Sequence, residues 1–478
     1  MGRLDAELRE IACGLFLRSL ADCSIERAFA DKVKRVSDGR GRELLAIGED
    51  TIDLECIRRI RVIAVGKAAS AMLQALLPSL RGLPRCEISG VLIAGDRPSN
   101  LPAGFVFFAG GHPTPNQASI DGARAVLEVV RALRVDGSME DALCLFLISG
   151  GASAMMELPL DPAISQEDTV SFHRELVHSG GSISEINCVR KHFSAVKGGR
   201  LALEAEGVLS YSLLVSDVPE SQLDALGSGP TLPDRSTVEQ CREILKRYGL
   251  MERFPASVRE FFLSPQLRET PKAAQRSSRA VTILAAEDIS ELVKQRAEEL
   301  GFYAVVDNTC DDWDYAAAAE YLLQRLRELR REHDDVCLIS SGEVTVQLSG
   351  DAAGDVDGMG KPGVGGRNQH FVLYAATLLR RSDASVAVLS AGTDGVDGNS
   401  SAAGAVVDET TISNERLLAD ARIALRGFDS GGFLGDMGLT VSTGPTGNNL
   451  RDLRILLART SSESGRGLDV LSQDEGGF

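Results

Sequence analysis

The sequence predicts an α/β protein built on largely parallel sheet, and two observations support this fold class. Apolar, β-branched runs recur along the chain, for example "RVIAV" from Arg61, "CLFLIS" from Cys144 and "VAVLSAG" from Val386. Each run ends abruptly in small polar residues, and a helical segment often follows. Continuous apolar runs indicate strands buried on both faces, as in parallel sheets. Ligands of such sheets bind beyond the carboxyl ends of the strands, so we expect function at these small polar tips.

The length of the chain predicts more than one domain, because 478 residues exceed one ordinary hydrophobic core. Residues 263–280 are polar, contain two prolines and precede a fresh apolar run, which predicts a domain boundary. We therefore expect an N-terminal domain over residues 8–262 and a smaller α/β domain over residues 280–458. Residues 459–478 form a polar tail typical of disorder.

The overall charge excludes some classes of partner. A net charge of −17 argues against a general nucleic-acid or membrane-surface binder, which would need a basic face.

The nine cysteines show no CxxC spacing, so neither a zinc cluster nor a disulfide framework is expected. The N-terminal segment carries charges throughout, unlike a signal peptide or a membrane span. We expect a cytoplasmic protein, and a small anionic ligand stays compatible with this composition.

Three segments of the N-terminal half could bind an anion. "SGGAS", residues 149–153, can present backbone N–H groups at a strand-to-helix turn, although a tight turn would also need these glycines. Lys67 lies two residues past another strand, at the start of a helix, and would point into a cleft or lie at its rim. "NCVRKHFSAVKGGRLA", from Asn187, is a basic helix whose cations, Arg190 among them, either line an anion site or face solvent.

The C-terminal half adds a guanidinium and several carboxylates. "GVGGRNQHF", from Gly363, places Arg367 behind glycines, and arginine offers a planar fork that matches carboxylate or phosphate. "AGTDGVDGN" places Asp394 and Asp397 at a strand tip, where they could hold Mg²⁺ or serve as turn and helix-cap residues. Phosphoryl transfer needs such a set of backbone donors, carboxylates and cations.

Several common catalytic motifs are absent. No strand is followed by G-x-G-x-x-G, and neither a complete P-loop nor a G-x-S-x-G elbow occurs. The six histidines lack metal-ligand spacing, and His112, in a turn at a strand tip, is the one of interest. A nicotinamide on a standard dinucleotide loop therefore has no support in the sequence.

The ordered series "VGKAAS", "GGHPTPNQAS", "LISGGASAMMELP", "INCVRKHFSAVKGGRLA", "SDVP", "SSGEVTV", "GGRNQHF", "AGTDGVDGNSSAAGAVVD" and "TGPTGNNLRDLRILL" resembles the class II glycerate kinases. These are the glycerate 2-kinases, whose C-terminal part is the MOFRL domain, and the resemblance runs from about residue 8 to 458. It implies a Rossmann-like N-terminal domain, a smaller C-terminal α/β domain and an active site in the cleft between them. It also implies phosphorylation of D-glycerate to 2-phosphoglycerate with ATP and Mg²⁺.

The resemblance assigns roles to residues at matching positions. The family's active-site lysine and arginine fall on Lys67 and Arg367, which we predict to be catalytic. Residues predicted to bind nucleotide, phosphate or substrate are Ser149, Gly150, Gly151, Ser153, Asn187, Lys191, Gly366, Asn368, Thr393 and Thr446. Candidates for Mg²⁺ or for the base that orients the hydroxyl are Asp217, Glu343, Asp394 and Asp397, which the sequence does not rank.

Three departures from the family pattern leave the substrate open. Ala152 stands where a third glycine is usual, Glu220 follows "SDVP" in place of glycine, and His370 replaces a glutamate. They could shift the substrate to another small hydroxy acid. Two alternatives remain: a hydroxypyruvate reductase, and a non-catalytic sugar-acid or nucleotide-binding protein of the same fold. The expected partner is a small molecule, D-glycerate, and a homodimer stays open.

Overall fold

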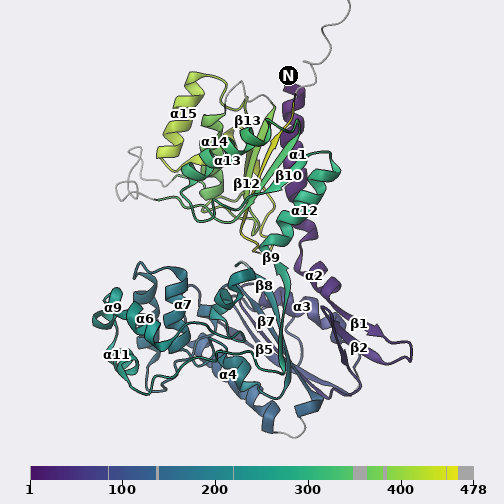
Figure 1. Ribbon diagram of the computed structural model, residues 1–478, viewed down its shortest axis with the longest axis vertical. Coiled ribbons are helices and arrows are strands. Elements are labelled where there is room, and N and C mark those ends of the chain that lie inside the picture. The colour runs from purple at the N-terminus through teal and green to yellow at the C-terminus, as the bar shows by residue number, and fades with distance from the viewer. Residues whose placement is uncertain are drawn as a thin grey trace, which may run out of the picture. The chain divides into compact units, whose positions relative to one another are not determined.

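The computed structural model describes residues 2–83, 85–135, 139–218, 220–347, 363–379, 385–447 and 449–460. The chain folds into two compact units (Figure 1). The larger unit holds residues 22–288 and 447–450, and the smaller holds residues 1–21, 289–446 and 451–478. Across the described residues, no helix is long and apolar enough to span a membrane.

The larger unit is built on a six-stranded parallel sheet, ordered β6-β5-β4-β7-β8-β9. The strands are β4 (Arg59–Val65), β5 (Glu87–Ala94), β6 (Phe105–Ala109), β7 (Ala142–Ser149), β8 (Leu209–Ser216) and β9 (Ser278–Ala285). Every residue of β7 is buried, as its continuous apolar run requires. Because β4, β7 and β8 are adjacent and parallel, the loops that follow them emerge at one edge of the sheet. The predicted α/β class with a largely parallel N-terminal sheet is confirmed.

Helices pack on this sheet, and a separate helical layer forms a second core in the same unit. α4 (Gln117–Val135) and α8 (Arg200–Glu204) pack on an apolar face that includes Ile63, Val65 and Phe146. A separate helical layer has a core rich in phenylalanine, with Phe172 stacked on Phe193 at 4.0 Å between ring centroids. That layer contains α6 (Gln166–Val177), α7 (Ile183–Phe193), α9 (Val238–Arg247), α10 (Leu250–Arg253) and α11 (Ala256–Leu263). α7 begins at a capping box between Ser182 and Glu185, which fixes its N-terminus.

The remaining elements of the larger unit are short. A three-stranded antiparallel sheet is formed by β1 (Val33–Ser37), β2 (Glu43–Ile47) and β3 (Asp50–Asp53). The helical pieces are α2 (Ile25–Lys32), α3 (Ala69–Leu80), α5 (Ala152–Met155), η1 (Met139–Asp141) and η2 (Glu220–Ser228).

The compact units are bounded differently from the predicted domains. The strand that follows residues 263–280 is β9, and it pairs with β8 as the edge strand of the larger sheet. The larger unit therefore continues to residue 288. The N-terminal helix α1 (Gly2–Asp22) belongs up to residue 21 with the smaller unit, where Arg9 forms an ion pair with Asp408 at 3.0 Å.

The smaller unit has a mixed six-stranded sheet, ordered β10-β11-β15-β12-β13-β14. Its strands are β10 (Tyr303–Val306), β11 (Val336–Ser341), β12 (Val386–Gly392), β13 (Gly404–Asp408), β14 (Thr440–Val441) and β15 (Asp452–Ala458). Only the β10–β11 pair is parallel in this sheet. Because β15 runs antiparallel between β11 and β12, its first residue, Asp452, lies at the edge where those two strands end.

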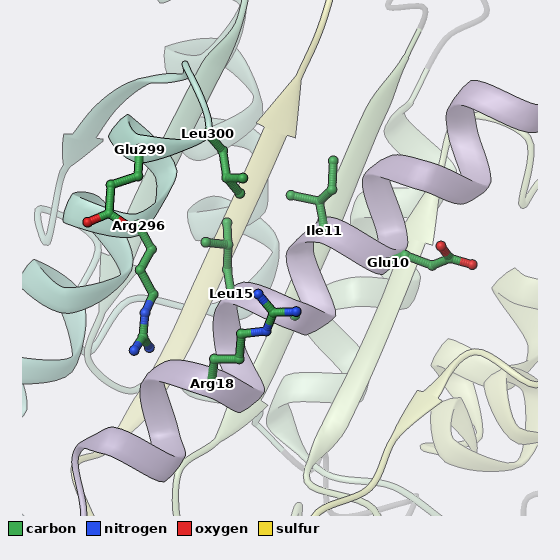
Figure 2. Close-up of a pocket in the computed structure, with 8 residues that line it drawn as sticks. Glu10, Ile11, Leu15, Arg18, Arg296, Glu299 and Leu300 are labelled. Atoms are coloured by element: carbon green, nitrogen blue, oxygen red, sulfur yellow. The ribbon is translucent and has the colours of Figure 1, made fainter.

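Helices of the smaller unit pack against this sheet. α13 (Tyr315–Leu329) and α14 (Arg367–Leu378) bury Leu322, Leu326 and Phe371 in its core. The other helices are α12 (Ala286–Glu299), α15 (Glu415–Arg426) and α16 (Ser430–Asp436). A cavity of about 380 Å³ lies between α1 and α12. Figure 2 shows Leu15 and Leu300 among its lining residues, with Arg18 and Arg296 beside them. The Arg296 guanidinium donates to Ser19 Oγ at 2.9 Å, which fixes α12 on α1.

Candidate functional site

In the larger unit, the loops after β4 and β7 are tied together. The backbone N–H of Lys67 donates to the Gly150 carbonyl at 2.9 Å, and that of Ala68 donates to Ser149 Oγ at 3.1 Å. Gly66 has a φ of 121°, and a Cβ there would lie 2.4 Å from Ser149 Oγ. This close approach requires glycine. Lys67 and the segment "SGGAS" are therefore brought to one place.

Lys67 and His112 meet over Gly151. A Cβ at Gly151, where φ is +83°, would lie 3.0 Å from Lys67 Cγ and 3.3 Å from His112 Cδ2. Lys67 is exposed, and no hydrogen bond or ion pair of its amine occurs among the residues described by the structure. Burial lowers the pKa of His112, and the nearby charges of Lys67 and Arg190 lower it further. The imidazole is therefore kept neutral beside two cations.

Asp217 lies against the same loop from the neighbouring strand. It follows β8 directly, and a Cβ at Gly150 would lie 2.4 Å from its Oδ2. The glycine thus allows the carboxylate to approach the backbone of "SGGAS". Asp217 is the predicted metal candidate that shares an edge of the sheet with Lys67.

The predicted binding residues Ser153, Asn187 and Lys191 have partners within the protein. Ser153 Oγ lies 2.7 Å from Ser228 Oγ, which donates to Asn187 Oδ1 at 2.9 Å. This chain of hydrogen bonds connects α5 to α7. The buried ammonium of Lys191 forms ion pairs with Asp224 at 2.7 Å and Asp234 at 3.2 Å. Its charge is balanced inside the fold, so the geometry favours a structural role for Lys191 over ligand binding.

A buried charged cluster that the sequence analysis did not identify follows α5. The Lys197 ammonium lies 2.6 Å from Glu157 Oε2, and His173 Nε2 lies 2.7 Å from the same oxygen. Burial alone would raise the pKa of Glu157, but Lys197 and His173 lower it to about 2. Burial lowers the pKa of His173 to about 4, against the opposing effect of Glu157. The cluster therefore holds an ionised glutamate and a neutral histidine near neutral pH, while burial lowers the pKa of Lys197.

In the smaller unit, Arg367 is the first residue of α14 and is held by two carboxylates. Its Nε donates to Asp452 Oδ2 at 2.6 Å, its Nη2 to Asp452 Oδ1 at 3.2 Å, and its Nη1 to Glu343 Oε2 at 2.8 Å. Burial alone would lower the pKa of Arg367, but Asp452 and then Glu343 raise it above its ordinary value. The guanidinium is permanently charged and its orientation is fixed.

Asp397 caps the same helix. Its carboxylate accepts the backbone N–H groups of Asn368 at 3.0 Å and Gln369 at 2.8 Å. A Cβ at Gly366 would lie 2.3 Å from Asp397 Oδ1, so this glycine makes room for the protein's own carboxylate. Burial raises the pKa of Asp397 to about 6. The helix-cap alternative therefore accounts for Asp397 better than metal binding does.

Asn368, Thr393, Thr446 and Asp394 also have partners in the smaller unit. Asn368 is buried, and its Oδ1 accepts from Ser390 Oγ at 2.6 Å. Thr446 Oγ1 donates to the Thr393 carbonyl and Thr393 Oγ1 to the Arg451 carbonyl, both at 2.7 Å. Asp394 Oδ1 accepts the N–H of Val396 at 3.1 Å. Within the part of the chain that the structure describes, no three His, Cys, Asp or Glu side chains form a metal cluster.

Two carboxylates that position the arginines, Asp311 and Asp452, are not among the residues predicted from the sequence. Arg451 donates to both oxygens of Asp311 at 2.7 Å, and Asp311 Oδ1 accepts the backbone N–H of Glu343 at 2.9 Å. Asp452 is the partner of Arg367. The signal was the "RD" pair at the start of the last apolar run, where two opposite charges precede a buried strand.

Two departures from the family pattern prove to be packing features. His370 is buried, with its ring 4.6 Å from that of Tyr315 and 5.5 Å from that of Phe428, and burial lowers its pKa to about 4. Ala152 is buried beneath Gly227, where an added Cβ would lie 2.9 Å from the alanine methyl. The side chain of Glu220 lies outside the described residues.

The fold and these clusters define a two-unit α/β protein with small polar loops at the ends of its parallel strands, an arrangement that suits a small-molecule kinase. Residues 12–263 match a family model described as "Domain of unknown function (DUF4147)", and residues 336–452 match the MOFRL family. The chain belongs to the class II glycerate kinases, the glycerate 2-kinase family with a MOFRL domain.

Two known sequences and one crystal structure are similar to this chain. D-glycerate 2-kinase of Thermotoga maritima is 34% identical over 85% of this chain and 92% of its own length. A putative hydroxypyruvate reductase of Agrobacterium vitis is 31% identical over 84% of this chain and 87% of its own. The crystal structure of a glycerate kinase from Thermotoga maritima superimposes with a TM-score of 0.77 at 32% identity, over 95% of this chain and 100% of that one.

Proposed function

We propose that this protein is a glycerate 2-kinase, which transfers the γ-phosphoryl group of ATP to the 2-hydroxyl of D-glycerate. The observation that carries the proposal is the arrangement around Lys67. This exposed amine passes over Gly151, between the loops that follow two adjacent parallel strands, in a chain of the glycerate 2-kinase family. A cation at such a strand tip offsets the charge that spreads over a transferring phosphoryl group.

We assign Arg367 a second role in stabilising charge. Both sides of its guanidinium are held, by Asp452 and by Glu343, so its free edge has a fixed direction. A preorganised cation needs no reorganisation at the moment of reaction, which is where electrostatic catalysis gains most. Its side chain is 38% exposed, which leaves part of the guanidinium accessible to a ligand.

Fewer of the four predicted carboxylates are suited to binding Mg²⁺ than the sequence alone suggests. Mg²⁺ binds through one or two carboxylates and keeps waters and phosphate oxygens as further ligands. Asp397 caps α14 and Glu343 pairs with Arg367, so Asp217 and Asp394 are the better candidates of the four. When bound, Mg²⁺ would neutralise charge on the nucleotide phosphates.

We place the reaction in the cytoplasm, with a small molecule as the partner. All nine cysteines are free, as in a reducing compartment, and the net charge of −17 disfavours nucleic acid and membrane surfaces. A homodimer is compatible with this proposal. The molecular mass of the protein in solution would show whether it forms one.

The test is an ADP-release assay across small hydroxy acids, with phosphorus NMR to identify the phosphorylated carbon. We expect D-glycerate to be preferred and phosphate to appear on carbon 2. Lys67→Ala should reduce kcat on the order of 10²-fold, whereas Lys246→Ala, at an exposed position on α9, should not. NADH consumption with hydroxypyruvate would instead make the protein a reductase. Thermal stabilisation by ligands without ADP release would make it a binding protein.

A further inference from the structure

Unlike its neighbour Lys191, Arg190 has no hydrogen-bond or ion-pair partner among the residues that the structure describes. Its Nε is buried without a hydrogen-bond acceptor, and its guanidinium forms no ion pair with any described residue. The next residue, Lys191, is balanced by Asp224 and Asp234. Removing a guanidinium from water without a counter-ion raises the free energy of the folded protein. A bound ligand with a negative charge would offset this cost.

The position of Arg190 brings it to the loop around Lys67. Asn187 lies one helical turn before Arg190, on the same face of α7, and is joined through Ser228 to Ser153. The charge of Arg190 acts on His112, whose ring lies over Gly151 beside Lys67. Lys67 and His112 therefore contact the turn "SGGAS", and Arg190 lies close enough for its charge to act on His112.

The nearby carboxylates do not neutralise Arg190. Glu157 is within electrostatic reach, but its carboxylate is already shared by Lys197 and His173. Asp217 lies against Gly150, the residue before Gly151 in the same loop. Exposed Lys67 and largely buried Arg190 therefore lie in this region without an ion-pair partner among the described residues.

We propose that Arg190 binds the carboxylate of the acceptor hydroxy acid and so selects the substrate. This inference rests on the proposed function. A guanidinium fork matches a planar carboxylate with two parallel hydrogen bonds, whereas the flexible ammonium of Lys67 suits a phosphoryl group as a point charge. In a 2-hydroxy acid, the carboxylate carbon is bonded directly to the carbon that bears the reacting hydroxyl. Anchoring the carboxylate at Arg190 thus holds that hydroxyl near Lys67.

The test compares Arg190→Met and Arg190→Lys with the wild type and with Arg124→Met, a control at an exposed position on α4. We expect the KM for D-glycerate to rise at least ~10-fold in Arg190→Met and less in Arg190→Lys, with the KM for ATP within about twofold of wild type. Glycerol, which lacks the carboxylate, should be phosphorylated equally poorly by all four proteins. A rise in the KM for ATP alone, or no change in either KM, would overturn the inference.

Binding measurements separate this inference from the proposed function. If the wild type releases no ADP with D-glycerate, the proposed function fails. D-glycerate should still raise the melting temperature of the wild type and leave that of Arg190→Met unchanged, and equal shifts would overturn the role of Arg190. If Arg190→Met does not fold, as judged by circular dichroism, Arg190→Lys carries the same comparison.

Discussion

The guanidinium of Arg367 is held by both carboxylate oxygens of Asp452, although 85 residues separate the two in sequence. Asp452 is buried, with 4% of its side chain exposed, whereas Arg367 is 38% exposed. The pair joins the first residue of α14 to the first residue of β15, which lies at the edge of the sheet where β11 and β12 end. A buried carboxylate thus fixes the direction of a partly exposed cation.

Arg367→Lys should lower kcat on the order of 10²-fold. The planar guanidinium binds Asp452 and Glu343 at the same time through separate N–H groups. A lysine ammonium lacks this planar arrangement and cannot be held in the same orientation. A positive charge remains beside Asp452, so the variant should stay folded. Steady-state kinetics with D-glycerate and ATP measure the effect. Arg416→Lys is the control, since its side chain is 91% exposed on α15. An unchanged kcat in Arg367→Lys would exclude a catalytic role for the guanidinium.

Gly151→Ala should reduce activity at least ~10-fold, because the new methyl group would contact Lys67 Cγ at 3.0 Å and His112 Cδ2 at 3.3 Å. It should also cost about 1–2 kcal/mol of stability, since φ is +83°. Gly180→Ala is a matched control, because φ there is +80° and no atom lies within 4 Å of the added carbon. Urea unfolding should show similar losses for both variants, while the kinetic loss should occur in Gly151→Ala alone. Equal kinetics in the two variants would contradict the placement of Lys67 in the active site.

The sequence identifies the polar residues at the ends of the strands. It does not identify the residues that their side chains contact. An apolar run that ends in glycine and serine is a local pattern, so Lys67 and "SGGAS" could be identified without knowledge of the sheet order. Asp452 could not, because its meeting with Arg367 depends on the long-range pairing of β15 with β11 and β12. Adjacent residues show the same limit: Arg190 and Lys191 look alike in sequence, but only Lys191 meets carboxylates from η2 and the loop after it.

The sequence is compatible with two roles for Asp397, and the contacts in the structure favour one of them. A carboxylate among glycines at a strand tip fits both a metal ligand and a helix cap. The choice depends on Asn368 and Gln369, whose N–H groups reach it from the start of α14, 28 and 29 residues away.

Asp397→Ala should therefore lower the free energy of unfolding by about 1–2 kcal/mol, the usual cost of losing a cap, and leave the response to Mg²⁺ unchanged. The stability change is measured by urea unfolding. The Mg²⁺ concentration that gives half-maximal ADP release is measured in the same preparation. Asp420→Ala, at an exposed position on α15, is the control and should change neither quantity. A several-fold shift in the Mg²⁺ requirement of Asp397→Ala would restore this carboxylate as a metal ligand.

His173→Gln should reduce the sensitivity of the larger unit to acid. Burial lowers the pKa of His173 to about 4, from an ordinary value of 6.5, so between these values the unfolded chain binds more protons than the folded protein. The free energy of unfolding must then fall as the pH drops from 6.5 to 4, by at most about 1.4 kcal/mol per pH unit for one group.

Glutamine cannot titrate, but its amide can still donate to Glu157, so the variant should fold and lose stability less steeply over this range. Urea unfolding at pH 7, 5.5 and 4.5 measures the slope, with His178→Gln as the control at an exposed position after α6. A slope in His173→Gln as steep as that of the wild type would show that the acid sensitivity comes from other groups. A steeper slope would show that the imidazole is charged in the folded protein, as the ion-paired partner of Glu157.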